Sequence, residues 1–264
     1  AIDLTKLFPS QSSTSNDQRL TIEYTNNPAW FMIQALPAVG HPHDDCVVCQ
    51  AASLYANSIG RHILSQTPHA KHIFEMWRHE GTAGSLQSAL AKNEELKTIV
   101  LNETPWVMDA DREQEQKSKL ADFFDENLID QRIDKATEQL RQLQNENGAW
   151  SWWPGMEVSF SMTVEVSEML TRLQKMTGQK AVDNDMLKKA YAYLDNEIVK
   201  MVDEMKKEER KGHPQTFPSY KALQYLYLST LSGRTPSAKV SEAQAYLKKL
   251  LKKEVRKWGF RKAL

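Results

Sequence analysis

Residues 129–143, IDQRIDKATEQLRQL, carry the pattern that decides the fold class. Their apolar side chains recur at alternating spacings of four and three residues, so they form one stripe along a helix. The stripe consists of Ile129, Ile133, Ala136, Leu140 and Leu143. Polar and charged residues occupy the other faces. The segment is therefore predicted to be an amphipathic helix with one buried side.

Similar patterns occur on both sides of this segment. Further helices are predicted over residues 28–36, 45–65, 70–79, 85–92, 162–173, 187–205, 220–228 and 241–255. The first should end before Pro37, and the helix over 220–228 is apolar nearly all round, as an inner helix would be. About nine helices without intervening strands predict an all-α domain of stacked antiparallel pairs. Their alternation of more buried and more exposed helices favours an α/α toroid.

The N-terminal part has a different composition. Residues 9–19 form a polar, Ser-rich linker, and residues 20–25 alternate apolar and polar as a strand does. A single strand needs partners, so we expect it to pair with a neighbouring β-domain. The predicted division is residues 1–27 as linker and strand, and residues 28–264 as the helical domain. Both ends read as cuts within a longer protein, with the toroid truncated at its C-terminus.

The overall composition excludes some classes of function. Lys and Arg together number 34, as do Asp and Glu, so the formal net charge is zero. This balance gives no electrostatic reason to expect nucleic acid as a partner. No apolar run approaches the roughly 18 residues of a membrane span, and the N-terminus lacks the apolar stretch of a signal peptide.

Residues 41–50, HPHDDCVVCQ, gather reactive groups ahead of the helix predicted over 45–65, for which Asp44 or Asp45 is the expected N-cap. Four donors, His41, His43, Cys46 and Cys49, would complete a tetrahedral zinc site. They are almost contiguous, however, whereas structural zinc sites usually draw their ligand pairs from separate segments. We therefore predict neither a metal nor a cofactor, and keep a zinc-stabilised binding domain as an alternative.

The two cysteines have other chemistry open to them. A C-x-x-C pair at a helix N-terminus has lowered thiol pKa values, but no βαβ pattern surrounds this one, so a thioredoxin-like enzyme is not expected. Two buried thiols and a local disulfide formed in an oxidising compartment both remain open. An enzyme would instead use Asp44 and Asp45, beside the two histidines, as its acid and base.

Residues 147–155, NGAWSWWPG, join two amphipathic helices. Glycine and proline turn the chain, while Trp150, Trp152 and Trp153 supply a large apolar surface. We predict that these indoles pack as a structural plug over the end of the helical domain. The alternative is an exposed aromatic platform for a sugar or a peptide.

Four sequence blocks occur together in a particular order. They are residues 21–31 (TIEYTNNPAWF), 45–58 (DC…YANS), 102–115 (NETPWV followed by DREQE) and 147–155. In this order they resemble the bacterial alpha-2-macroglobulin-like proteins from about residue 20 to at least residue 175. The resemblance implies that the chain is the thioester-containing domain, an α/α toroid inserted through a β-sandwich domain. Such an insertion would account for the isolated strand.

The resemblance also identifies a candidate site. In the family, the Cys and Gln of a Cys-x-Glu-Gln motif form an internal thioester that acylates an attacking protease. The YANS block aligns Cys46 with the family's cysteine, Val48 with its glutamate and Cys49 with its glutamine, while Gln50 lies one residue beyond. The resemblance therefore implies a degenerate thioester site at Cys46, Cys49 and Gln50, without a working thioester.

The function implied is that of a non-catalytic domain in an endopeptidase inhibitor. Such a protein, periplasmic or attached to the cell surface, would trap proteases by conformational change. Its partners would be macroglobulin-type β-domains of the same polypeptide and the target proteases, and a lipid anchor on the parent protein is left open. The alternatives are a zinc-stabilised binding domain and an α/α-toroid carbohydrate-active enzyme, either a lyase or a glycosidase.

Overall fold

The structure is a computed structural model, and it describes residues 28–42, 44–82, 115–178 and 184–257. Throughout these ranges the regular structure is helical, and extended pairing is limited to two isolated β-bridges, Gln144 with Trp150 and Ser151 with Val158. The all-α prediction is therefore confirmed for the described part. The predicted linker (9–19), strand (20–25) and helix over 85–92 lie outside the described residues, as do the resemblance block at 102–107 and His43.

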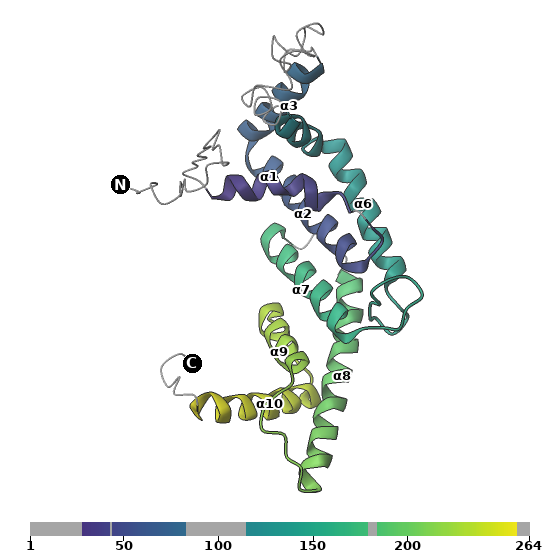
Figure 1. The fold of residues 1–264 in the computed structure, drawn as a ribbon, viewed down its shortest axis with the longest axis vertical. Helices are drawn as coiled ribbons and strands as arrows, with labels where there is room; N and C mark the ends of the chain where they lie inside the picture. Colours follow the sequence, from purple (N-terminus) through teal and green to yellow (C-terminus); the bar gives the residue numbers. More distant parts are fainter. Residues whose placement is uncertain (1–27, 43, 83–114, 179–183, 258–264) are drawn as a thin grey trace, which may run out of the picture. The chain divides into compact units, whose positions relative to one another are not determined.

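The helices follow one another along the chain as the stripes predicted (Figure 1). Their bounds are α1 (Ala29–Gly40), α2 (Val47–Gln66), α3 (Pro68–Thr82), α6 (Glu126–Leu143), α7 (Phe160–Thr177), α8 (Asn184–Arg210), α9 (Tyr220–Ser232) and α10 (Ala238–Lys257). Residues 115–123 are also helical. None of the helices in the described part is long and apolar enough to cross a membrane.

The chain divides into two compact units, Ala1–Ile33 and Gln34–Leu264. Of the first unit, only residues 28–33 are described. Within the second, α2 packs against α3, α6 and α7, while α7 also packs against α8 and α9, and α8 packs against α10. The helices α2 and α7 therefore have neighbours on more than one side.

The apolar stripes identify the buried faces correctly. All five residues of the 129–143 stripe are buried in α6. In α8, which covers the helix predicted over 187–205, the apolar stripe of Leu187, Ala190, Leu194, Ile198, Val202 and Met205 is buried, together with Met186 and Tyr191. One-sided periodicity was sufficient here because each helix turns its apolar side toward its neighbours.

The predicted end of α1 is wrong, because the helix continues through Pro37 to Gly40. Proline removes one helical hydrogen bond, which favours termination. The last turn is instead held by side chains of α2, since the Gly40 carbonyl accepts hydrogen bonds from Ser53 Oγ at 2.8 Å and from Asn57 Nδ2 at 3.0 Å. These contacts between helices outweigh the local signal.

The prediction that the 220–228 helix is an inner helix is also wrong. In α9, Tyr225 is buried, but Tyr220 is 74% exposed and Tyr227 is 47% exposed. A tyrosine can face water because its hydroxyl makes polar contacts. The Tyr227 hydroxyl accepts a hydrogen bond from Arg172 Nη2 at 2.5 Å, and the Arg172 guanidinium lies 5.7 Å from the ring centroid.

Candidate functional site at the start of α2

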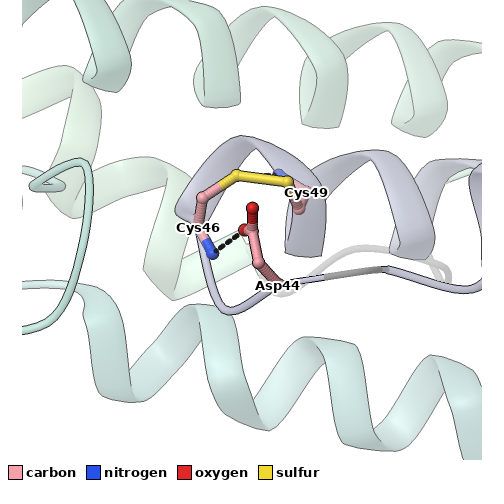
Figure 2. Close-up of side chains that lie close together, drawn as sticks. All are labelled: Asp44, Cys46 and Cys49. Atoms are coloured by element: carbon pink, nitrogen blue, oxygen red, sulfur yellow. Dashed lines mark hydrogen bonds between the residues drawn. A yellow bond between two sulfur atoms is a disulfide. The ribbon is translucent and has the colours of Figure 1, made fainter.

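The N-cap of α2 is Cys46, and not Asp44 or Asp45 as predicted. The Cys46 backbone is extended, and its Sγ accepts a hydrogen bond from the Cys49 N–H at 3.1 Å. Asp44 precedes the N-cap by two residues, and its Oδ1 accepts a hydrogen bond from the Cys46 N–H at 2.8 Å (Figure 2). The Cys46 sulfur is held at the capping position by a covalent bond to the first turn of the helix.

This covalent bond is a disulfide between Cys46 and Cys49 (Figure 2). Their Cα atoms lie 5.2 Å apart, within the range of about 4.4–6.8 Å found for disulfides. Cysteines three residues apart meet poorly inside a regular helix. Here the bond can form because Cys46 lies outside the helix, with an extended backbone. Cys46 is buried and Cys49 is half-buried.

The disulfide changes the interpretation of the metal-like cluster. Asp44, Cys46 and Cys49 have their ligand atoms within 4.8 Å of one another, but both sulfurs are bonded to each other. Metal ligation by cysteine requires the thiolate, so this oxidised pair does not supply it. His41, a member of the alternative zinc set, has its Nδ1 at 2.8 Å from the Pro37 carbonyl oxygen.

Gln50, the displaced acyl partner of the family motif, lies in the first turn of α2 and is only 2% exposed. Its Nε2 donates to the Asp44 carbonyl at 3.2 Å, whereas its Oε1 has no hydrogen-bond partner. Beside it is a cavity of about 250 Å³, also lined by Asp45, Gln139, Gln142, Leu143 and Pro154. The carboxamide is thus anchored through its nitrogen, next to a small cavity.

The prediction of a tryptophan plug is correct for Trp150 and wrong for Trp152 and Trp153. Trp150 is fully buried, and its indole N–H donates to the Leu140 carbonyl at 2.9 Å. Trp152 and Trp153 are 43% and 42% exposed, and their rings stack on each other with centroids 5.5 Å apart. The chain turns after Ser151, whose Oγ donates to the Trp153 carbonyl at 3.0 Å, so the last two indoles leave the core.

The structure brings the aromatic loop and the cysteine site together. The Val47 N–H, in the first turn of α2, donates to the Trp152 carbonyl at 3.0 Å. One of the free N–H groups of the helix N-terminus is therefore satisfied by a segment about a hundred residues away. Sequence spacing gave no sign of this contact, because the bond uses backbone atoms that carry no residue-specific signal.

A second polar cluster has no counterpart in the sequence motifs. The Arg234 guanidinium lies over the Tyr191 ring, 3.7 Å from its centroid, and donates to Asp195 at 3.2 and 3.4 Å. The Tyr225 hydroxyl donates to the same carboxylate at 2.6 Å. Burial raises the pKa of both tyrosines above its ordinary value. These residues come from α8, α9 and the turn that follows, so no local pattern could have grouped them.

Comparisons of the chain with protein-family models, with curated proteins and with solved structures returned no match.

Proposed function

We propose that this chain is the α/α-toroid domain of an alpha-2-macroglobulin-like endopeptidase inhibitor that has lost its thioester. The proposal starts from the four sequence blocks and is carried by one observation at the site. The sulfur of Cys46, the residue aligned with the reactive cysteine, is bonded to Cys49, the residue aligned with its acyl partner. A disulfide therefore stands where the family forms a thioester.

The chemistry of the site agrees with the loss of covalent capture. Thioester formation requires a thiolate to attack a carboxamide carbon and expel ammonia. The Cys46 sulfur is no thiolate, because it is already bonded, and the Gln50 amide nitrogen is held by the Asp44 carbonyl. The domain would then act as a structural and interaction module without catalytic turnover, trapping proteases together with neighbouring β-domains. A disulfide at this position also supports a periplasmic or cell-surface location.

One observation favours a second candidate, a carbohydrate-binding or carbohydrate-active protein. Trp152 and Trp153 present a stacked, half-exposed pair of indoles, and the adjacent Pro154 lines the cavity that Asp45 and Gln50 also line. Sugars bind through such aromatic surfaces and polar groups. Hydrolysis needs a second carboxylate beside Asp45. The neighbouring Asp44 is the candidate for this role, but its Oδ1 already accepts a hydrogen bond from the Cys46 N–H, so sugar binding is better supported than hydrolysis.

Intact mass spectrometry of the non-reduced chain tests the lost thioester. We expect the mass of the plain sequence less two hydrogens, unchanged by methylamine, and the addition of two alkyl groups after reduction and alkylation. Loss of one ammonia, reversed by methylamine, would instead restore Gln50 as an acyl donor and contradict the proposal. Cys49→Ser is the matched control, because it leaves Cys46 as the sole thiol.

The inhibitor role has its own test in the parent protein that this proposal implies. Incubated with a labelled protease, that protein should hold the enzyme in a complex on size-exclusion chromatography and release it in denaturing detergent. A detergent-resistant adduct, or no complex with proteases of any class, would contradict non-covalent trapping.

A further inference from the structure

A second and larger cavity, of about 460 Å³, lies between α7, α8 and the turn after α9. Its size is within the range of about 300–1,000 Å³ typical of small-molecule sites. Its walls combine three cations with a buried floor; the residues that matter for binding are Thr171, Lys175, Leu187, Lys188, Tyr191 and Arg234. None of these residues belongs to the cysteine site or to the aromatic loop.

The charge of the cavity is positive. Lys175, Lys188 and Arg234 line it, and the described residues of its lining include no carboxylate. Lys175 and Lys188 are both exposed, and the ion pairs found within the described ranges include neither of them. Asp185, the acidic residue in the first turn of α8, pairs with Lys189 at 3.2 Å. The two lysine ammonium groups are therefore available to an anionic ligand.

Arg234 is held in place before any ligand arrives. Asp195 accepts two hydrogen bonds from its guanidinium, and the Tyr191 ring lies 3.7 Å beneath it. A cation over an aromatic face and a two-point contact with a carboxylate both restrict the side chain. Asp195 neutralises part of the Arg234 charge, so the two lysines supply most of the attraction, and Arg234 supplies a fixed wall.

The floor of the cavity is buried and uncharged. Thr171 is 2% exposed and Tyr191 is 6% exposed, and their hydroxyl groups are hydrogen-bonded to each other. Thr171 Oγ1 also lies 2.5 Å from the Ser167 carbonyl, to which it donates. Burial raises the pKa of Tyr191, so the phenol stays neutral and does not repel an anion. The Tyr191 ring and the buried Leu187 offer apolar surface to the body of a ligand.

We propose that this cavity binds a small organic oxyanion, whose phosphate or carboxylate group contacts Lys175 and Lys188 and whose apolar body lies against Leu187 and Tyr191. The start of α8 at Asn184, which also lines the cavity, adds the partial positive charge of a helix N-terminus. The proposal is independent of the proposed inhibitor function, since it uses none of the same residues.

Isothermal titration calorimetry of the 264-residue chain at low ionic strength tests the site. The probes are phenyl phosphate, benzoate and benzyl alcohol, which share a ring and differ in charge. We expect one or both anions to bind, more weakly as salt is added, and the alcohol not to bind. The anion that binds more tightly identifies the preferred head group. Binding of none of the probes, or equal binding of all three, would overturn the proposal.

A pair of double variants locates the binding. Lys175→Gln with Lys188→Gln should weaken anion binding by about tenfold or more, because it removes two charge-assisted contacts. The control, Lys248→Gln with Lys249→Gln, removes the same charge from exposed positions of α10 that do not line the cavity. Equal weakening in both double variants would show non-specific attraction. Circular dichroism checks that both remain folded, and each single cavity variant serves if the double one does not.

Discussion

The helices α2 and α8 are both buried against neighbours, but with different side chains. The buried face of α8 is a stripe of large apolar residues, such as Leu194, Ile198 and Val202. The buried face of α2 is small and polar by comparison, with Gln50, Ser53, Asn57, Ser58 and Gly60 among its buried residues. Small residues permit close approach between helices, while buried polar groups need partners.

The difference shows where each region gets its stability. Around α2, Asn57 alone joins three elements: its Nδ2 donates to the Gly40 carbonyl of α1, and its Oδ1 accepts from Arg132 Nε of α6 at 2.8 Å. In α8 the buried stripe contributes through the apolar surface it removes from water. Substitutions around α2 should therefore be judged by lost hydrogen bonds and shape, and substitutions in α8 by lost volume.

The largest effect is expected at the aromatic loop that caps α2. Trp150→Ala should lower the free energy of unfolding by about 3–5 kcal/mol, because it empties a fully buried site and leaves the Leu140 carbonyl without its indole partner. Trp152→Ala, two residues away and 43% exposed, should cost about 1 kcal/mol or less. Urea denaturation measures both; equal losses would mean that all the indoles form one plug.

The next effect compares two neighbouring polar residues of α2. Asn57→Leu keeps the approximate volume but should cost about 3 kcal/mol, since the Gly40 carbonyl and Arg132 each lose a partner. Ser58→Ala is the matched control, because the buried Ser58 Oγ has no hydrogen-bond partner, and this change should be neutral or slightly stabilising. If Asn57→Leu were as mild as Ser58→Ala, hydrogen bonds would not be what sets α2 apart.

A smaller effect is expected in α8. Ile198 is fully buried in the apolar stripe, and Ile198→Val removes one methylene group. The cost should be about 0.5–1.5 kcal/mol, as for other such truncations in a packed core. Chemical denaturation again provides the measurement. A cost matching that of Asn57→Leu would break the distinction between the two regions.

The smallest effect is a pH dependence in the α8–α9 cluster. Burial, and then the hydrogen bond to Asp195, raise the pKa of Tyr225 above its ordinary value of 10.0. The stability linked to this proton is fully present below pH 10 and is lost as the pH rises further, because only the unfolded chain then ionises readily. Between pH 9 and 10.5 the wild type should lose up to about 1 kcal/mol more than Tyr225→Phe. Tyr191, whose pKa is also raised, is present in both proteins and cancels. Parallel pH profiles would contradict the assignment.

The local pattern of the chain was enough to predict most helices and their buried faces. The 129–143 stripe and most of the 187–205 stripe are buried as expected, because periodicity follows from helix geometry alone. The turn between α6 and α7 was also predicted from local sequence, by the glycines and the proline of residues 147–155. Gly148 there has a φ of +89°, and a side chain on it would collide with the Lys189 carbonyl of α8.

The tertiary structure decided the features that depend on contacts between distant segments. It carried α1 past Pro37, exposed Trp152 and Trp153, and assembled a cavity from residues as far apart as Thr171 and Arg234. It also resolved what the sequence left open at Cys46 and Cys49, by giving Cys46 the extended backbone of an N-cap that lets the sulfurs meet. The sequence by itself determined which residues prefer burial in a helix, since that preference is set within a few turns. Which partners those residues meet depends on how the helices pack, and the free energy of packing is shared among residues far apart in the chain.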